Sequence, residues 1–542
     1  MYHAENMVTV ALFIALSHSR ILQTPDIALY EGIGKYRRSI KTKSQAAYQY
    51  DMQGLAMLYS FDYNGASRSF SKSITLDPDQ VFGYWGKAMT YGNTINWSND
   101  KDDHIAAVDE LEKAKSHRAF GSPVENDLVD ALVSRFSPSG PDRKLDIAYS
   151  NEMRHVYSKY PNDPDVASLF AESILNLRPW KQWTLDGRPE EGTEEAMKVL
   201  RHALDLNQNH PQALHLWIHT LEGSKEPQRA LPEAYRLLNL QPDLSHMQHM
   251  PSHIFDRAGK YRDAIESNLK SVSTAKRTWG TGGRGKTLDF AHGRHMLIHA
   301  AAMRGQSELA LQHWSQMFDG IPGQSLDKLG ELGDFYQGMK YMLLVRFGKW
   351  QDILNEPTPP ERFVFTKAMK AEATGIAYAA MKNPTKAREA QQEFLAASEK
   401  SPSGGVAAYK AIYRIAGELL EGEILVSEGK VEAALEHLRQ AVAAEDKLPY
   451  TEPPDWIQPT RHTLGAALVD AGEYQEAIDV YKEDLRQHPE NGWALYGLYR
   501  ANVGLGKTKD ASKALSEFKV AWVDADLITT SSCLCMPEKK KG

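Results

Sequence analysis

The chain has 542 residues, 42% of them hydrophobic and 25% charged, which argues against a disordered protein and favours a soluble, folded one. Its 63 basic and 70 acidic residues give a formal net charge of −7 without a basic stripe, so no nucleic acid is expected as a partner. Cys533 and Cys535 are too few for a disulfide framework, and we expect them in a tail beside the lysines at 539–541 rather than in a metal site.

The first 45 residues are interpreted as an N-terminal helical segment that packs on the helices after it. Residues 7–17 have the sequence MVTVALFIALS, an apolar run that is too short to cross a bilayer. No Lys or Arg precedes this run, whereas Glu5 does, which argues against a signal peptide. We therefore expect a cytoplasmic protein that does not enter a membrane, with a cleaved N-terminal signal as the alternative.

A spacing pattern of small, aromatic and proline residues predicts repeated helix pairs from about residue 47 onward. In this pattern a Gly, an Ala, an aromatic residue and a Pro follow one another at fixed intervals. The pattern occurs near both ends of the chain with the same intervals, as Gly54, Ala66, Phe70 and Pro78 and again as Gly465, Ala477, Tyr481 and Pro489. Residues 137–143, SPSGPDR, interrupt the helical periodicity and are expected to form a turn.

Residues 177–193 combine Gly, Pro and two tryptophans, and we expect an ordered insertion at the edge of a groove. Trp180 and Trp183 are interpreted as packing residues, with a substrate-covering role as the alternative. Glu172 and Asn176 lie just before the insertion and are four residues apart on a helix. They are therefore expected to lie close to one concave face, where they can orient a substrate.

Histidines are concentrated in the middle of the chain. Eight of the 19 lie between positions 215 and 299, where an even distribution would place roughly three. They are His215, His219, His246, His249, His253, His292, His295 and His299. The pair His215 and His219 recurs as His249 and His253. The offset between the two pairs equals the length of the tetratricopeptide (TPR) repeat, a helix–turn–helix unit of roughly 34 residues.

The histidines take the same positions in three successive repeats of this kind. They occupy positions 5 and 9 of the first repeat and positions 2, 5 and 9 of the next two, and Glu222 takes position 12 of the first. Residues at i, i+3, i+7 and i+10 share one face of a helix. We therefore expect three neighbouring helices to direct eight imidazoles and Glu222 at one patch of the groove. Pro251, between His249 and His253, either kinks this helix or begins a later one.

These patterns predict an all-α fold, a right-handed TPR-type α-solenoid. A solenoid of this length need not divide into globular domains, because each repeat buries its apolar face against its neighbours. The expected parts are an N-terminal helical segment at 1–45, TPR-like repeats at 46–200 with the insertion at 177–193, histidine-rich repeats at 201–320, C-terminal repeats at 321–524 and a flexible tail at 525–542.

The chain resembles a family of full-length TPR proteins, common in bacteria, that have a histidine-rich middle. The resembling blocks, which extend from about residue 50 to 530, are GLAMLYSFDYNGASRSF, FAESILNLRPWKQWT, ALHLWIHTLEGS, HMPSHIFDRAGKYRDAIESN and EDLRQHPENGWALYGL. The resemblance implies a metal-binding TPR protein and implies no substrate. Where the family more usually has a stretch similar to HNxHF, this chain has AHGRHMLIH, so the resemblance extends to His292 and His295 but not to His299.

Imidazole is a common ligand of zinc, copper and iron, and three or four ligands complete one site. The eight histidines and Glu222 therefore suffice for two metal ions, or for one ion whose ligands are supported by the remaining residues. Single histidines usually pack between helices or face solvent. Their repetition at positions 5 and 9 argues against that interpretation here.

We expect a metal-dependent enzyme that acts on a small organic molecule. Nitrogen ligands favour copper or iron and oxidative chemistry, whereas zinc would favour a hydrolase or lyase with Glu222 or Glu172 as the base. The alternative is a TPR scaffold that binds a peptide or protein partner and holds a structural metal. TPR grooves that bind carboxylates use Lys and Arg on this face rather than His, which favours the enzyme and a small-molecule partner.

Overall fold

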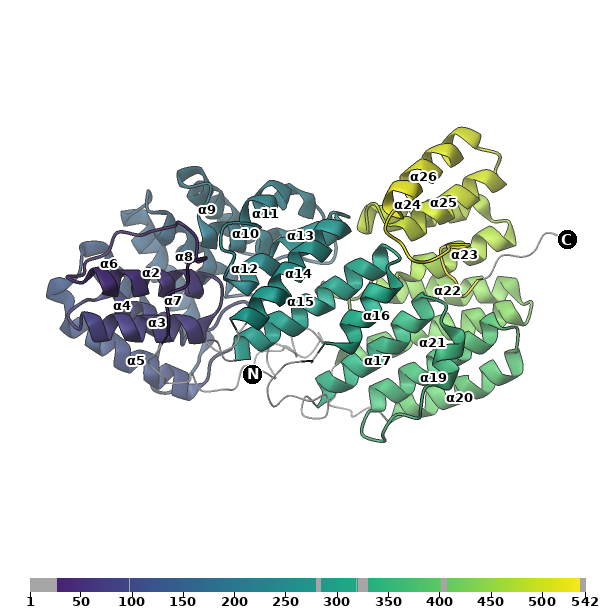
Figure 1. The fold of residues 1–542 in the computed structure, drawn as a ribbon, viewed down its shortest axis with the longest axis horizontal. Coiled ribbons are helices and arrows are strands. Elements are labelled where there is room, and N and C mark those ends of the chain that lie inside the picture. The colour runs from purple at the N-terminus through teal and green to yellow at the C-terminus, as the bar shows by residue number, and fades with distance from the viewer. Residues whose placement is uncertain are drawn as a thin grey trace. The chain divides into compact units, whose positions relative to one another are not determined.

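The computed structural model describes residues 27–96, 98–278, 284–317, 319, 330–400 and 407–536 (Figure 1). The apolar run at 7–17 and the last six residues lie outside these described residues. The described chain is a succession of α-helices, and its β structure is limited to one bridge between Trp183 and Pro189. The prediction of an all-α fold built from helix–turn–helix repeats is confirmed.

Helices α2 to α15 occupy the first part of the chain. Their bounds are α2 Gln45–Tyr59, α3 Tyr63–Leu76, α4 Phe82–Met89, α5 Lys101–Ser116, α6 Pro123–Val133, α7 Arg143–Lys159, α8 Pro164–Leu175, α9 Thr193–Leu206, α10 Pro211–Glu222, α11 Leu231–Leu237, α12 Ser245–His249, α13 Pro251–Arg257, α14 Tyr261–Arg277 and α15 Arg284–Met303. Short 3-10 helices lie at Arg118–Phe120 and Pro227–Ala230.

Helices α16 to α26 continue the same pattern. Their bounds are α16 Ser307–Ser315, α17 Glu331–Arg346, α18 Trp350–Asn355, α19 Val364–Ala380, α20 Pro384–Glu399, α21 Ala407–Ser427, α22 Val431–Glu445, α23 Thr460–Ala471, α24 Tyr474–Gln487, α25 Gly492–Gly504 and α26 Thr508–Ala521. Consecutive helices pack as pairs, for example α2 with α3, α8 with α9, α19 with α20 and α25 with α26 (Figure 1).

The described residues form two compact units. The N-terminal unit contains the described residues up to Phe255 and also Glu266–Gly293, and the C-terminal unit contains Asp256–Ile265 and the described residues from Arg294 onward. The segment 201–320, which we treated as one part of the chain, therefore contributes residues to both units.

The aromatic residue of the repeat pattern packs against the glycine that opens the same pattern on the preceding helix. Phe70 on α3 is fully buried, and a Cβ atom on Gly54 of α2 would lie less than 3.0 Å from its ring. Tyr481 on α24 has the same relation to Gly465 on α23 and to Gly497 on α25. Each ring thus fills a space that a side chain on the neighbouring helix would occupy, which explains why the pattern requires glycine.

Helix α10, which carries the first two histidines of the repeat series, is fixed at its start by buried polar contacts. His210 caps the helix, because its Nδ1 accepts a hydrogen bond from the Ala213 N–H at 3.2 Å. Its Nε2 donates to Asp165 Oδ1 at 3.0 Å, and the same oxygen accepts from the Tyr59 hydroxyl at 2.5 Å. The end of α2 is thereby held beside α8 and α10.

The interruption at Pro251 separates two short helices. Helix α12 ends at His249, and α13 begins at Pro251. Proline suits the first position of a helix, where its missing N–H would have no partner in any case. Of the two alternatives for this proline, the structure has the later helix start, with His246 and His249 on α12 and His253 on α13.

The end of the described chain is packed, whereas we expected residues 525–542 to be a flexible tail. Ser532 is buried, and its hydroxyl hydrogen-bonds with Tyr481 OH at 2.6 Å and with a backbone carbonyl of α23 at 2.8 Å. Cys533 and Cys535 are also buried and form a disulfide with each other. The sequence suggested a tail because of its closing lysines, but the small polar residues before them find hydrogen-bond partners in the C-terminal unit.

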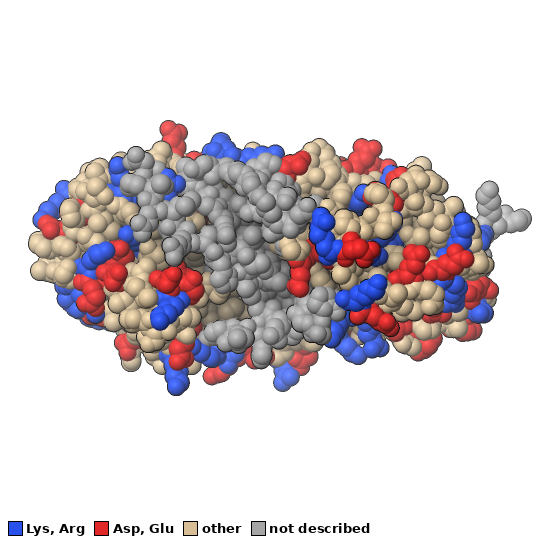
Figure 2. Space-filling view, turned by 90° about the horizontal axis from the view of Figure 1, so that it is seen from below, with Lys and Arg blue, Asp and Glu red and all other residues tan. Residues whose placement is uncertain are grey.

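The surface of the described residues agrees with the charge pattern of the sequence. Basic and acidic side chains are interspersed on the face shown in Figure 2, and neither sign forms a continuous stretch there. Among the described helices, none combines the length and the apolar character that crossing a membrane requires.

The glycine–aromatic contact gives a test of the repeat packing. Gly465→Ala places a methyl group against the Tyr481 ring, and we expect a loss of about 1–3 kcal/mol in the free energy of unfolding, measured by chemical denaturation. Gly417→Ala is the matched control, because a Cβ atom there would meet Phe394 Cε1 at an ordinary 3.4 Å. Equal stabilities of the two variants would contradict this account.

Candidate metal centre

Six of the eight histidines gather inside the N-terminal unit. All six side chains are buried, with exposed fractions between 0% and 6%. The rings lie close together, with centroid separations of 4.8 Å between His215 and His219 and 4.5 Å between His249 and His253. The six residues are His215 and His219 on α10, His246 and His249 on α12, His253 on α13 and His292 on α15.

The first triad consists of His215, His219 and His246, each of which offers a ring nitrogen within 4.8 Å of the others. His215 Nδ1 donates to the Tyr59 backbone carbonyl at 2.7 Å, since a carbonyl can only accept. The neutral ring therefore has its lone pair on Nε2, which lies 3.1 Å from His246 Nε2. His219 Nε2 is buried and makes no hydrogen bond with any residue in the described part of the chain.

The second triad consists of His249, His253 and His292, which again offer nitrogens within 4.8 Å of one another. His249 Nδ1 donates to Asn268 Oδ1 at 2.7 Å, which leaves the lone pair on its Nε2. This Nε2 lies 2.6 Å from His253 Nε2. Each triad thus brings ring nitrogens together in the interior of the unit.

Glu222, the last residue of α10, contacts one ring of each triad. Its Oε1 accepts from His219 Nδ1 at 2.8 Å, and its Oε2 lies 2.8 Å from His253 Nδ1. His219 Nδ1 therefore carries the proton. The contact with His253 is not a hydrogen bond, but a carboxylate oxygen at this distance favours the proton on Nδ1 over a lone pair, which it would repel. We expected Glu222 as a metal ligand or a base. Its two oxygens instead face the outer nitrogens of two rings, a geometry that supports an orienting role.

Burial keeps three of the six rings neutral near neutral pH. The pKa values of His215, His219 and His249 are all held well below the usual 6.5, first because burial disfavours the charged imidazolium and second because neighbouring histidines repel it. Neutral imidazole is the form that binds a metal ion. These three rings therefore retain ligand-competent nitrogens over the whole physiological range of pH.

His295 and His299 belong to the C-terminal unit and are not members of either triad. His299 Nδ1 lies 3.0 Å from Asp256 Oδ1, and the His295 ring lies 5.2 Å from the Tyr336 ring, edge to face. Burial lowers the pKa of His295 to about 3. We expected all eight rings at one patch because they share helix faces. A shared face does not fix depth, since His299 lies about 10 Å further along the axis of α15 than His292.

Glu172 and Asn176 lie on and at the end of α8, next to α10. Glu172 Oε2 accepts from Gln212 Nε2 at 2.7 Å, and Gln212 precedes His215 by one helical turn on α10. Asn176 Nδ2 donates to the Asn93 backbone carbonyl at 3.3 Å. Burial raises the pKa of Glu172 to about 7, so this carboxyl exchanges a proton near neutral pH.

The tryptophans of the insertion contact α10 in two different ways. Trp183 donates from its indole Nε1 to the Thr220 backbone carbonyl at 2.6 Å and so anchors the insertion to the helix. The Trp180 ring approaches His219 edge to face, with centroids 6.1 Å apart. Trp180 also has a φ of 63°, a left-handed conformation that bulky residues rarely adopt. The packing interpretation fits Trp183, and Trp180 borders the first triad.

Phe61, in the turn between α2 and α3, is a neighbour of the cluster that the sequence did not indicate. Its ring centroid lies 4.5 Å from that of His215, 6.0 Å from His219 and 5.5 Å from His246. Phe61 too has a left-handed backbone, with a φ of 58°. Residues other than glycine with a left-handed backbone are often found at functional sites. Two such residues, Phe61 and Trp180, lie beside the first triad, which is consistent with a functional site there.

Two further partners of the rings, Tyr59 and Asn268, were also missed. Tyr59 acts through its backbone carbonyl, which no side-chain pattern can reveal. Asn268 lies on α14 as a fully buried polar residue, and Ser267 and Ser271 on the same helix are buried as well, so no pattern in the sequence set it apart.

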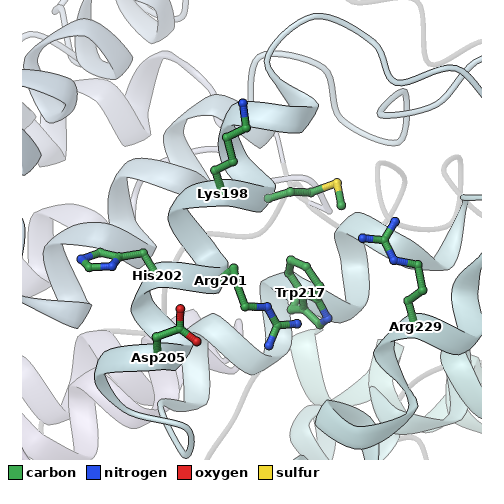
Figure 3. A pocket seen from close by; sticks show the side chains of 7 residues that line it. Lys198, Arg201, His202, Asp205, Trp217 and Arg229 are labelled. Atoms are coloured by element: carbon green, nitrogen blue, oxygen red, sulfur yellow. The ribbon is translucent and has the colours of Figure 1, made fainter.

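A surface groove of about 560 Å³ lies behind α10 and differs in character from the histidine cluster (Figure 3). The Arg201 guanidinium lies 4.2 Å from the centre of the Trp217 ring, and it also pairs with Glu233 at 3.0 Å. The groove is open and is lined by Met197, Lys198, Arg201, His202, Asp205, Trp217 and Arg229. Its paired charges are those of a packed helix surface rather than of a built site.

Comparison with known proteins identifies one segment. Residues 468–517, from the end of α23 into α26, match the tetratricopeptide repeat family. No curated protein sequence matches the chain.

Solved structures similar to the chain include the human IFIT1 dimer with m7Gppp-AAAA, at 12% identity and a TM-score of 0.33, covering 86% of this chain and 94% of that one. Another is the Cut9–Hcn1 hetero-tetramer of the APC/C, at 12% identity and a TM-score of 0.28, covering 89% of this chain and 82% of that one. TM-scores this low carry no argument about ligands or partners. Residues 468–517 of this all-α chain are a tetratricopeptide repeat.

Proposed function

We propose that the histidine cluster binds transition metal ions, and that the protein is a metal-dependent enzyme that oxidises a small organic molecule. One observation carries the proposal. Three rings of the cluster donate from Nδ1 to an acceptor, so that their lone pairs lie on Nε2, and a fourth ring has its Nδ1 beside a carboxylate oxygen. The three donating rings are those of His215, His219 and His249, with the Tyr59 carbonyl, Glu222 and Asn268 as acceptors. The fourth is His253, whose Nδ1 lies 2.8 Å from Glu222 Oε2 without a hydrogen bond.

This arrangement is the one that histidine ligands show in metalloproteins, where the second ring nitrogen donates to a carboxylate, a carbonyl or a water. Two nitrogens bound to one zinc ion at about 2.0–2.1 Å in tetrahedral geometry are about 3.3 Å apart. The 3.1 Å between His215 Nε2 and His246 Nε2 is close to that value. The 2.6 Å between His249 Nε2 and His253 Nε2 is shorter, and a small rotation of one ring would accommodate an ion.

The donor set favours oxidative chemistry over hydrolysis. Six imidazole donors suit copper or iron, which would supply redox chemistry when bound, and they also suit zinc. A zinc hydrolase or lyase needs a nearby base. Glu222 does not fit that role, because its oxygens face the Nδ1 atoms of His219 and His253. Glu172 remains as the candidate base, and it contacts Gln212, one helical turn before His215 on α10. Zinc-dependent hydrolysis with Glu172 as the base is therefore the second form of the proposal.

The residues around the cluster have roles of their own in this proposal. Phe61 and Trp180 pack against the first triad and exclude water from one side of it. Glu172, with a pKa of about 7, can hold or release a proton close to the cluster. Asn176, at the end of the same helix, remains a candidate for orienting a substrate.

A scaffold function is the alternative, and the tetratricopeptide repeat at 468–517 favours it. In that case the protein binds a peptide or protein partner, and the metal holds the repeats in place. The two functions differ in whether the metal-loaded protein turns over a small molecule.

Removing two ligands tests metal binding. The double variant His249→Ala, His253→Ala should lose the copper, iron or zinc held by the second triad, because that triad keeps one of its three nitrogens, so the metal content should fall to at most that of the first triad. Metal content of protein purified without a histidine tag is measured by elemental analysis, and circular dichroism should show that most of the helix is retained. His295→Ala, a buried histidine outside both triads, should keep the wild-type metal content. A double variant with unchanged metal content would refute the ligand assignment.

Oxygen uptake separates the enzyme from the scaffold. Wild-type protein loaded with copper or iron should consume oxygen with a panel of phenols, amines and alcohols, and the double variant should not. The same panel with zinc-loaded protein and ester or amide substrates covers the hydrolytic form. The scaffold prevails if no panel gives turnover and a peptide partner binds only in the presence of metal.

Glu172 predicts a pH-dependent stability. Its pKa is about 7 in the folded state and about 4.5 when unfolded, so the folded state binds the proton more tightly and stability falls as pH rises from 4.5 through 7. The glutamine of Glu172→Gln does not titrate, so this variant should not show the loss in free energy of unfolding, which is on the order of 3 kcal/mol for the wild type. Denaturant unfolding at pH 4.5 and pH 8 measures this: relative to the wild type, the free energy of unfolding of the variant should be higher at pH 8 than at pH 4.5. A difference that does not change with pH would contradict the assignment.

A further inference from the structure

The two triads are separate donor sets. Within each triad the three nitrogens lie within 4.8 Å of one another, and each triad draws on at least two helices. His246 and His249 are both on α12 but contribute to different triads. Three protein nitrogens are a sufficient set for a catalytic metal ion, which keeps a further coordination position open for water or substrate. Each triad therefore has enough ligands for an ion of its own.

Glu222 links the two donor sets through its two oxygens. Oε1 contacts His219 of the first triad and Oε2 contacts His253 of the second, both at 2.8 Å and both at Nδ1. A carboxylate has acceptors on both oxygens and no proton of its own. It therefore fixes the tautomer of His219 through a hydrogen bond and, by charge alone, favours the same tautomer of His253, with the lone pairs on the two Nε2 atoms. One residue thus prepares one ligand in each triad.

We infer that the cluster is a two-ion centre with one ion in each triad, and that Glu222 is the positioning residue that the two sites share. The inference rests on the proposed metal binding and adds to it the number of ions and the residue on which that number depends. In this account Glu222 binds neither ion and does not take part in proton transfer.

An amide at position 222 cannot do what the carboxylate does. Its oxygen accepts from one ring, but its NH₂ group donates and therefore needs a lone pair on Nδ1 of the other ring. That ring must then carry its proton on Nε2, so its triad loses one of three ligands. Glu222→Gln should therefore remove one of the two ions rather than weaken both equally.

The test is a cobalt(II) titration of metal-free protein, followed through the visible absorption bands of the bound ion and checked by elemental analysis. We expect two equivalents for the wild type and one for Glu222→Gln, with the same helicity by circular dichroism. Glu222→Asp keeps both acceptors on a shorter side chain and should restore the second equivalent with weaker affinity. Glu172→Gln is the matched control, because it removes a buried carboxyl that contacts Gln212 instead of a ring, and it should bind two equivalents.

Single-ligand variants keep the test valid if Glu222→Gln does not fold. His219→Ala and His253→Ala each remove a ligand of a different triad, so each should bind one equivalent and the double variant none. A single ion shared by both triads predicts instead that either replacement weakens the same ion. One equivalent in the wild type, or two in a folded Glu222→Gln, would overturn the two-ion inference and leave metal binding intact. A wild type that binds no cobalt, copper, iron or zinc would refute the proposed function itself.

Discussion

The burial of six imidazole rings side by side is the constraint on which the interior of the N-terminal unit depends. Burial disfavours the charged form of an imidazole ring, and repulsion by neighbouring histidines disfavours it further. The pKa values of His215, His219 and His249 are therefore held well below the usual value. A neutral buried ring still has one N–H that needs an acceptor. The surrounding helices supply these acceptors, and in doing so they fix which nitrogen of each ring has a lone pair.

The repeat architecture makes this arrangement possible. Neighbouring helices place equivalent residues side by side, so a histidine pair on α10 is repeated as His249 and His253 on the next helices. Some acceptors are local, such as Glu222 on α10 itself, whereas others come from elements further away in the chain. The Tyr59 carbonyl is 156 residues from His215, and α2 is held in place by the contact of the Tyr59 hydroxyl with Asp165. The metal proposal therefore depends on packing between distant repeats as much as on the histidines themselves.

The sequence was sufficient for the fold class and for the core of the candidate site. The recurrence of the histidine pair at the repeat length predicted that His215 and His219 lie near His249 and His253, and the structure places them so. Periodicity could not give depth along a helix, so it did not separate His295 and His299, which belong to the C-terminal unit, from the other six histidines. It also could not show that Glu222 faces outer ring nitrogens, because that depends on the position of His253 on another helix.

Other features escaped the sequence for different physical reasons. Phe61 has a left-handed backbone in a turn where glycine would be expected. The sequence therefore indicated an ordinary loop residue and not an aromatic ring that contacts the histidines. The segment before residue 536 is short and mixes polar with apolar residues, and only tertiary contacts such as that of Ser532 with Tyr481 show that it is packed. Local patterns predict helices, whereas contacts between distant segments decide which polar groups are satisfied.

The most direct test of the metal centre is an anomalous difference map, collected at the cobalt absorption edge from crystals of the cobalt-loaded wild-type protein. The account predicts strong peaks inside the N-terminal unit, one beside the ring nitrogens of His215, His219 and His246 and one beside those of His249, His253 and His292. Peaks only at surface residues or near Cys533 and Cys535, with none among these six rings, would contradict it.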